Sequence, residues 1–186
     1  MIVAVYCGSS SGNNSNYINE TKKLGKFLAQ NNIDVVYGGG KVGLMGTIAD
    51  SVLEHGGKVY GVIPEKLKEK ELAHIGLTDL KTVNTMHERK AMMASMADAF
   101  ITLPGGAGTL EEIFEAWTWA QLGYHNKPCA FYNIDGFYDD LFKMIEKMTT
   151  TGFLKKDYLD MLINTANTEE LIASLKNYKA PNEKWN

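Results

Sequence analysis

Three glycine-rich loops of the chain could bind an anionic group. They cover residues 7–12, 38–46 and 104–109, and each follows a short apolar run that is typical of a buried strand. The carboxyl ends of parallel strands meet at one edge of a sheet, where each following helix presents free backbone N–H groups. A single loop of this kind is also typical of an ordinary tight turn. Three at the same edge predict a cradle for an anion, most simply phosphate.

The loop at 38–46 also has the G-x-G-x-x-G spacing of a dinucleotide-binding loop. We favour this interpretation less, because the loop follows the second expected strand, and Glu65, the acidic residue near the required offset, comes after a proline. A P-loop is excluded more plainly, since Val42 stands where the magnesium-binding hydroxyl is needed. ATP hydrolysis is therefore not supported, and a nicotinamide-dependent oxidoreductase is the weaker alternative.

Arg89 is the only arginine among the 19 lysine and arginine residues of the chain. It precedes Met92, Met93 and Met96 by three, four and seven positions, which places its guanidinium on the apolar stripe of an expected helix. A planar guanidinium can bind phosphate or carboxylate through two parallel hydrogen bonds, which lysine cannot do. Arg89 is thus a candidate ligand of an anion, with a single structural salt bridge as the alternative.

Glu111 and Glu112 directly follow the third glycine-rich loop. Thr109 and Glu112 have the spacing of a capping box, which satisfies free N–H groups at a helix start, and Thr85 with Glu88 has the same form. Negative charge beside a phosphate cradle is unusual unless sugar hydroxyls, a water molecule or a developing cation must be bound. We therefore favour a functional role for Glu112 over a purely capping one.

Short β-rich runs alternate with amphipathic stretches along the whole chain. The expected strands cover residues 2–7, 33–37, 59–63, 80–83, 99–103, 128–132 and 162–164. The expected helices cover residues 17–30, 44–55, 86–96, 109–122, 138–149 and 169–178. This alternation predicts an α/β fold with a mostly parallel sheet and helices on both faces. A length of 186 residues without a linker or repeat predicts a single domain over 1–186.

Composition and charge exclude several classes of protein. Hydrophobic residues at 45% and charged residues at 22% are typical of a soluble globular protein. A net charge of −3 and scattered lysines provide no basic surface for a nucleic acid. The apolar run at the amino terminus is too short for a membrane span or a secretory signal. Cys7 and Cys129 lie in expected strands, where a buried reduced thiol packs as a small hydrophobe, so we expect a cytoplasmic protein. The four histidines have no metal-ligand spacing, so no metal site is expected.

Two motifs resemble those of a known family. The residues MHERK at 86–90 and PGGAGTLEE at 104–112 are similar to the paired MHxRK and PGGxGTxxE motifs of the LOG ("Lonely guy") family. Its members are cytokinin riboside 5′-monophosphate phosphoribohydrolases, formerly labelled lysine decarboxylases. The loop at 38–46, the pair at 71–72 and the segment at 118–123 also resemble their family counterparts, so the resemblance covers nearly the whole chain.

The resemblance implies a Rossmann-like three-layer αβα fold, a homodimer and catalysis without a cofactor. The implied reaction is hydrolysis of the N-glycosidic bond of a purine nucleoside 5′-monophosphate, giving the free base and ribose 5-phosphate. Ala107 occupies a position that plant members often fill with tyrosine, so AMP is at least as suitable a substrate as a cytokinin nucleotide. Arg89 and Glu112 are the implied catalytic pair. The implied substrate contacts are Glu71, Lys90, Gly105, Gly106, Gly108, Thr109, Glu111 and Thr118.

These assignments are chemically coherent. Cleavage of a glycosidic bond builds positive charge on the ribose, which the Glu112 carboxylate could stabilise while it orients or deprotonates the attacking water. Glu111 could hold the sugar hydroxyls. The 5′-phosphate would rest on residues 105–109, and Arg89 would either bind that phosphate or orient Glu112. No residue stands out as the acid that protonates the leaving base.

A nucleotide-binding or cofactor-carrier protein without turnover is the main alternative function, because such a site needs the anion cradle but not the carboxylate. The helices expected at 86–96 and 109–122 have large apolar residues on more than one face. Either a subunit interface over these two helices or a thick core explains that pattern.

Overall fold

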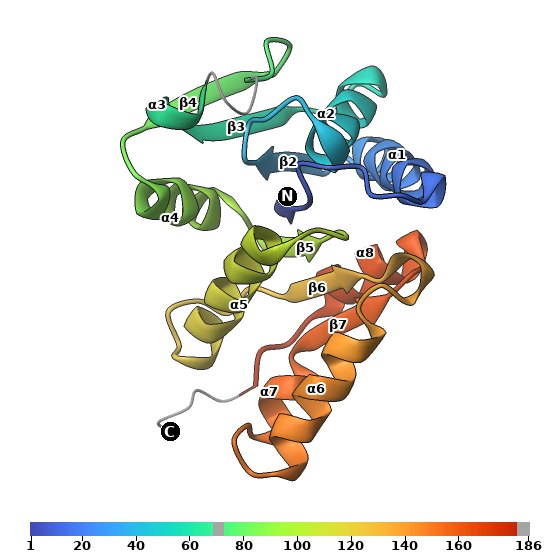
Figure 1. Cartoon of the computed structure of the whole chain (residues 1–186), viewed down its shortest axis with the longest axis vertical. Coiled ribbons are helices and arrows are strands. Elements are labelled where there is room, and N and C mark those ends of the chain that lie inside the picture. The colour runs from blue at the N-terminus through green and yellow to red at the C-terminus, as the bar shows by residue number, and fades with distance from the viewer. Residues whose placement is uncertain (69–72, 182–186) are drawn as a thin grey trace.

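Seven parallel strands form a single sheet (Figure 1). The computed structural model describes residues 1–68 and 73–181. The strands are β1 (Ile2–Tyr6), β2 (Asp34–Tyr37), β3 (Val59–Pro64), β4 (Asp79–Val83), β5 (Ala99–Thr102), β6 (Cys129–Tyr132) and β7 (Leu162–Thr165). Their order is β4-β3-β2-β1-β5-β6-β7, and each pair of neighbours is parallel. The prediction of a mostly parallel sheet is confirmed.

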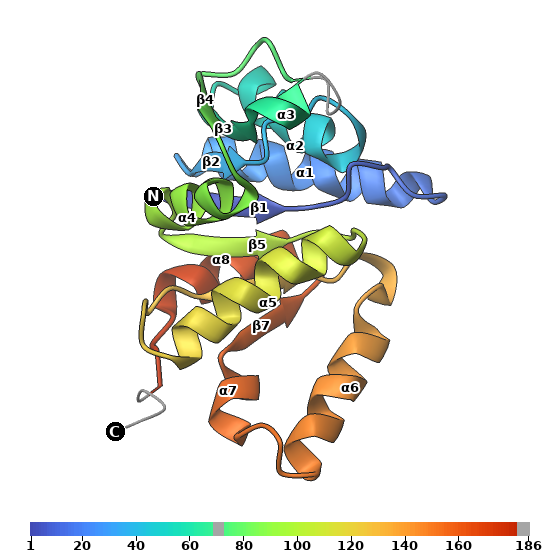
Figure 2. The same cartoon turned by 60° about the vertical axis from the view of Figure 1, so that its left-hand side comes forward.

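Helices cover both faces of this sheet. They are α1 (Ser15–Gln30), α2 (Gly43–Glu54), α3 (Glu65–Lys68), α4 (Met86–Met96), α5 (Ala107–Gln121), η1 (Ile134–Gly136), α6 (Asp139–Thr150), α7 (Lys156–Asp160) and α8 (Thr168–Asn177). Buried side chains of α1, α2 and α8 pack on one face, and those of α4 to α7 pack on the other. Figure 2 shows α4 and α5 crossing in front of the strands, so the three-layer αβα arrangement is confirmed. Within the described ranges, no helix is long and apolar enough to cross a membrane.

Successive residues of β1 contribute to the two cores in turn. Val3 and Val5 belong to the core beneath α1, α2 and α8, whereas Ala4 and Tyr6 belong to the core beneath α4 and α5. This follows from the geometry of a strand, in which neighbouring side chains point to opposite faces. The loop after β1 therefore begins between the two layers of helices, where its residues can contact either layer.

The strand order changes direction between β1 and β5. From β1 the chain moves outward through β2 and β3 to β4, and then returns to place β5 on the other side of β1. Open α/β sheets bind ligands at such a switch point. The loops that diverge from it are joined by hydrogen bonds, because the Gly8 N–H donates to the Pro104 carbonyl at 3.0 Å and the Leu103 N–H donates to the Tyr6 carbonyl at 2.9 Å.

The loop after β2 reaches the same place through a close backbone approach. Gly43 has a φ of +63°, and a Cβ atom there would lie 2.3 Å from the carbonyl carbon of Ser9. The Met45 N–H, one turn into α2, donates to the Gly8 carbonyl at 3.3 Å. Only glycine fits both the backbone conformation and the contact at position 43. The three glycine-rich loops thus meet at one edge of the sheet, as their positions predict.

Candidate active site

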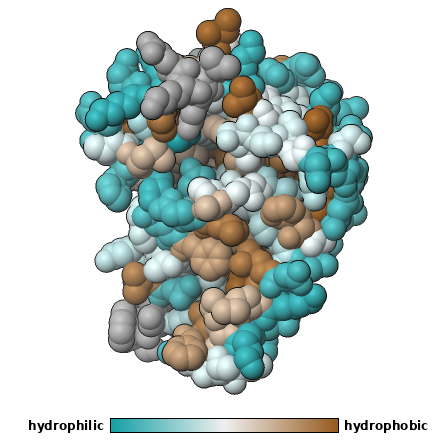
Figure 3. Space-filling view, in the orientation of Figure 1, coloured by the Kyte–Doolittle hydropathy of each residue, from teal (hydrophilic) through white to brown (hydrophobic). Residues whose placement is uncertain are grey.

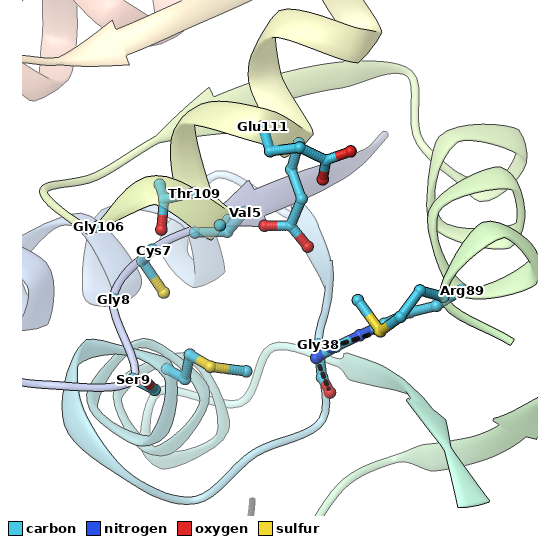
Figure 4. A pocket seen from close by; sticks show the side chains of 13 residues that line it. Val5, Cys7, Gly8, Ser9, Gly38, Arg89, Gly106, Thr109 and Glu111 are labelled. Atoms are coloured by element: carbon cyan, nitrogen blue, oxygen red, sulfur yellow. Dashed lines mark hydrogen bonds between the residues drawn. The ribbon is translucent and has the colours of Figure 1, made fainter. Parts of the chain in front are cut away.

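The three glycine-rich loops border a cavity of about 260 Å³ at the switch point (Figure 4). Its wall comes from the end of β1 and its loop, the loop after β2, the starts of α2 and α4, and the start of α5. The lining residues are Val5, Cys7, Gly8, Ser9, Gly38, Met45, Met86, Arg89, Gly106, Gly108, Thr109, Glu111 and Glu112. The predicted catalytic pair therefore lies in one cavity.

Arg89 is fixed by the sheet beneath it. Helix α4 begins at the predicted capping box, in which the Thr85 hydroxyl accepts a hydrogen bond from the Glu88 N–H at 3.1 Å. One turn into this helix, Arg89 is 5% exposed. Its Nε donates to the Val62 carbonyl at 3.1 Å. Its Nη2 donates to the Gly38 carbonyl at 2.7 Å, a bond that Figure 4 shows. The burial predicted from the apolar stripe is confirmed.

The absence of a side chain at Gly38 makes room for this guanidinium. A Cβ atom at position 38 would lie 2.0 Å from Nη2 of Arg89 and 2.7 Å from Cε of Met45. The first of these distances is far below any van der Waals contact, so a larger residue would displace the arginine. The triple glycine after β2 thus has a steric purpose at its first position, which is to let Arg89 reach the strand end.

Helix α5 begins two residues earlier than the expected start at residue 109. It starts at Ala107 with Gly106 as its N-cap, and among the described residues no side chain caps its first turn. Thr109 therefore lies inside that turn, so the less favoured capping-box interpretation of Thr109 and Glu112 is wrong. The physical reason is that the extended Gly106 lets the helix begin on the glycine-rich segment itself. Glu112 therefore does not form a capping box with Thr109. The backbone N–H groups in the first turn of α5 border the cavity.

Gly106 and Gly108 leave space that the protein itself does not fill. A Cβ atom at either position would meet no atom within 4 Å among the described residues. Both glycines line the cavity, and no acidic residue occupies the first turn of α5. Backbone N–H groups at a helix start attract anions, and the bare glycines let a ligand approach them closely. This arrangement suits a phosphate group.

Negative charge at Glu112 acts on buried groups at the end of β1 and in the loop that follows it. Burial, and then the charge of Glu112, raise the pKa of the Cys7 thiol, so this thiol stays protonated at neutral pH. Burial and the three glutamates Glu112, Glu115 and Glu111 raise the pKa of the Tyr6 phenol in the same way. Cys7 lines the cavity but is no nucleophile, because the thiolate is the reactive form. The ionisable cavity groups are therefore carboxylates and a guanidinium.

A second cavity of about 300 Å³ adjoins the first. The two share Gly8, Ser9 and Gly106, and the second extends along the serines of the first loop towards Tyr17 and Phe137. Their rings pack edge to face, with centroids 5.9 Å apart. Gly105, a predicted substrate contact, lines this second cavity and not the first. The two cavities form one cleft across the carboxyl edge of β1 and β5.

The structure brings together most of the predicted site residues. Those that line the first cavity are Arg89, Gly106, Gly108, Thr109, Glu111 and Glu112. Lys90 lies outside this lining and is buried, with its ammonium bound to Glu111 and Glu115. Thr118 is exposed on α5, six positions beyond Glu112. Glu71 lies outside the described residues.

Several lining residues were missed by sequence reasoning. Val5, Met45 and Met86 supply apolar wall, and Cys7 also lines the cavity. A signal existed for Met86, which precedes Arg89 by three positions and is therefore its neighbour on the helix surface. Its Sδ lies 3.9 Å from Nη1 of Arg89. Apolar residues at strand ends carry no comparable signal, because burial in the core explains them equally well.

The fold and the cavity define a class of protein, namely a three-layer α/β protein with a glycine-lined cleft at the switch point of one parallel sheet. The family described as "Possible lysine decarboxylase" matches residues 45–175. Cytokinin riboside 5′-monophosphate phosphoribohydrolase LOG2 of Arabidopsis thaliana is 45% identical over 176 residues, which cover 95% of this chain and 83% of that protein. The phosphoribohydrolase LOG of Oryza sativa subsp. japonica is also 45% identical, over 95% of this chain and 73% of that protein. The chain belongs to the LOG family.

Solved structures with the same fold are more distant in sequence. The molybdenum cofactor carrier protein of Chlamydomonas reinhardtii has a TM-score of 0.72 and 18% identity, over 94% of this chain and 95% of that chain. The molybdenum cofactor binding protein of Rippkaea orientalis has a TM-score of 0.71 and 19% identity, over 94% of each chain. These similarities establish the shared Rossmann-like fold.

Proposed function

We propose that this protein hydrolyses the N-glycosidic bond of purine nucleoside 5′-monophosphates, with AMP and cytokinin riboside monophosphates as substrates. The observation that carries the proposal is that Arg89 and Glu112 line one cavity together with the uncapped first turn of α5. The names of the plant relatives support it, because they are phosphoribohydrolases at 45% identity over most of this chain. The products are the free base and ribose 5-phosphate.

The start of α5 binds the 5′-phosphate in this proposal. The N–H groups of its first turn border the cavity at Gly106 and Gly108, where no side chain is in the way. Phosphate bound there fixes a part of the substrate that does not react, so its binding energy positions the reacting carbon. The base and the ribose then lie towards the part of the cavity that Arg89 and Glu112 line. Nucleosides without the phosphate should be poor substrates for this reason.

Glu112 supports the charge that develops during cleavage. The bond between the anomeric carbon and the base nitrogen breaks, and its electron pair leaves with the base, so the ribose becomes cationic. A carboxylate beside the sugar stabilises that cation and accepts a proton from the water that attacks the anomeric carbon, while the nitrogen of the departing base takes up a proton from solvent. The fixed guanidinium of Arg89 supplies positive charge on the same cavity, which favours the departing base as its negative charge grows. Glu111 is available for sugar hydroxyls.

A decarboxylase function has weaker support than hydrolysis. Lysine decarboxylation with pyridoxal phosphate needs a lysine that holds the cofactor as a Schiff base. None of the described residues that line either cavity is a lysine. Lys90, the lysine next to Arg89, is bound by two carboxylates. The carrier alternative rests on fold likeness, and a carrier has no need of the carboxylate at position 112.

The test is chromatography of the products after incubation with AMP, isopentenyladenosine monophosphate and the matching nucleosides. We expect free base and ribose 5-phosphate from the monophosphates and neither product from the nucleosides. The relative rates rank the two monophosphates. Binding of the nucleotides without release of base would favour a carrier and contradict the proposed hydrolysis.

Gly108→Ala should separate substrate binding from stability. Glycine in a helix is less stable than alanine by about 0.5–1 kcal/mol, and a Cβ atom at position 108 meets no protein atom within 4 Å among the described residues. The variant should therefore melt at a higher temperature while its KM for AMP rises, because the methyl group takes space proposed for the phosphate. Thermal unfolding and steady-state kinetics measure the two effects. A more stable variant with an unchanged KM would place the phosphate elsewhere.

The proposed enzyme is a cytoplasmic homodimer without a nucleic-acid partner. Partly buried apolar side chains of α4 and α5 pack beside the core, among them Met92, Met96, Leu110, Phe114 and Trp119. Apolar residues gather in the middle of the face seen in Figure 3, close to α5. Burial of such a patch against a second copy favours association. Sedimentation velocity at micromolar concentration should therefore give twice the chain mass of 20.6 kDa, and a species at the single-chain mass would contradict the dimer.

A further inference from the structure

Arg89 and Lys90 are adjacent in α4, yet they connect the helix to different elements. Both are buried, at 5% and 7% exposed. Neighbouring residues of a helix point about 100° apart, so they cannot serve the same partner. Arg89 bonds to carbonyls at the ends of β2 and β3, whereas the Lys90 ammonium reaches α5. The catalytic helix is therefore attached both to the sheet and to the helix that carries the glutamates.

The partners of Lys90 lie on either side of Glu112 along α5. Nζ of Lys90 lies 2.5 Å from Oε1 of Glu111 and 3.1 Å from Oε2 of Glu115. Glu111 and Glu115 are four positions apart and so share one face of the helix, which lets a single ammonium bind both. Glu112 lies between them in sequence, and its side chain lines the cavity. A buried lysine thus holds the turn of helix from which the catalytic carboxylate projects.

The ammonium of Lys90 stays charged in this setting. Burial alone would lower its pKa, but hydrogen bonds to Glu111 and Glu115 and the charges of both carboxylates raise it. The cation is thus committed to two protein ligands and is shielded from solvent. A substrate phosphate would have to compete with two carboxylates for it, and Lys90 is not among the residues that line the first cavity.

We propose that Lys90 is a positioning residue, which sets the orientation and electrostatic surroundings of Glu112 by clamping Glu111 and Glu115 against α4. This inference rests on the proposed function for its catalytic consequence. It departs from the expectation that Lys90 contacts the substrate. The clamp fixes the spacing between Arg89 and Glu112, because each lies one residue from a member of the ion-paired cluster.

Charge makes the clamp testable. Three glutamates occupy positions 111, 112 and 115, so removal of the lysine leaves their negative charges without its compensation. Like charges favour the protonated form of a carboxyl group, so the pKa of Glu112 should rise relative to the wild type. The titratable or charged groups around Glu112 that share in this balance are Tyr6 of β1, Cys7 of the loop after β1, Arg89 and Lys90 of α4, and Glu111 and Glu115 of α5.

The kinetic experiment compares Lys90→Met, Lys90→Arg and Lys127→Met with the wild type on AMP. We expect Lys90→Met to lower kcat about 10- to 100-fold with KM changed less than about threefold, because ground-state contacts to the substrate persist. Lys90→Arg keeps a buried cation within reach of both glutamates and should restore kcat to within about threefold of wild type. Lys127 is the matched control, since its Nζ also bonds to α4, at the Ala94 carbonyl, 2.7 Å away. Its loss should leave kcat unchanged.

A second readout does not depend on turnover. Protein labelled with ¹³C at the glutamate carboxyl carbons is titrated by NMR, and the Glu112 signal is assigned from its absence in Glu112→Gln. The signal should titrate at higher pH in Lys90→Met than in wild type, and Lys127→Met should leave it in place. If the wild type releases no base from any monophosphate, the proposed function fails, whereas the clamp is still decided by this titration.

Several results would overturn the proposal. A raised KM with unchanged kcat in Lys90→Met would make Lys90 a substrate ligand. Equal losses of kcat in Lys90→Met and Lys127→Met would show a general structural role. An unchanged Glu112 titration in a folded Lys90→Met protein would remove the electrostatic link. Lys90→Arg as inactive as Lys90→Met would contradict the requirement for a buried cation.

Discussion

Glu112→Gln is expected to lower kcat for base release by at least about 10³-fold while the protein still binds AMP. The substitution keeps the size and most of the hydrogen-bonding capacity of the side chain but removes its negative charge. Without that charge, the ribosyl cation loses its counterion and the attacking water loses its proton acceptor, which are effects of about 10²–10⁴ each. Binding should survive because we propose that the phosphate binds the backbone N–H groups at the start of α5, whose first turn holds no acidic residue. Calorimetry with AMP and a steady-state assay give the two quantities.

The matched control for this variant is Glu146→Gln, which makes the same chemical change on the exposed surface of α6. Its kcat should equal that of the wild type. Turnover by Glu112→Gln within about tenfold of the wild type would show that the carboxylate is not catalytic. Loss of AMP binding in this variant would instead assign Glu112 to the binding of the ground state.

Arg89→Lys is expected to lower kcat by at least about 100-fold and to destabilise the fold. The guanidinium binds the Val62 and Gly38 carbonyls through two different nitrogens, and a single ammonium on a shorter stem cannot reproduce both bonds. A buried carbonyl that loses its donor costs about 1–3 kcal/mol. The positive charge would also move from the place where the leaving base needs it. Kinetics on AMP and urea unfolding measure the two losses.

His87→Ala is the companion variant, because His87 lies two positions earlier in α4 and is exposed. It should behave like the wild type in both measurements. An Arg89→Lys enzyme with normal kcat would mean that any cation at this position suffices. A stable fold with strongly reduced kcat would show that the catalytic effect does not arise from unfolding.

The sheet could be predicted closely because buried parallel strands leave a strong pattern. Strand β5 was expected at 99–103 and spans Ala99–Thr102, and β3 was expected at 59–63 and spans Val59–Pro64. Such strands have an apolar residue at nearly every position, and turn residues follow them. The long helices were found for a similar reason, since α1 and α4 repeat apolar residues with helical spacing.

The short helices were not predicted, because each is shorter than the repeat of apolar positions by which a helix is recognised in a sequence. Helix α7 covers only Lys156–Asp160, and η1 covers Ile134–Gly136 with Asp135 at a φ of +53°. One turn of helix does not repeat an apolar position, so tertiary contacts decide its form. Helix α3 (Glu65–Lys68) is likewise a single turn, and three of its four residues are charged.

The site was predicted well where its chemistry restricts the type of residue. It was predicted less well where the role of a residue depends on the direction in which its side chain points. Arg89 and Glu112 face one cavity, as their chemistry predicts. Lys90 belongs to the same motif as Arg89, and Thr118 to the segment at 118–123 that also resembles the family, but a motif does not say to which side of a helix a residue points. Lys90 points to the glutamates of α5, and Thr118 lies about 9 Å along the helix axis from Glu112. The start of α5 was misplaced because Gly106 and Gly108 weaken the local helical signal.

The most direct test of the proposed hydrolysis follows the oxygen of the attacking water. The protein is incubated with AMP in water enriched in ¹⁸O, and the ribose 5-phosphate is reduced at once with borohydride so that its C1 oxygen is trapped for mass spectrometry. One ¹⁸O atom per molecule at C1, formed together with one molecule of adenine and absent with Glu112→Gln, is the predicted result. Adenine release without ¹⁸O at C1, or equal release by the variant, would contradict hydrolysis at this site.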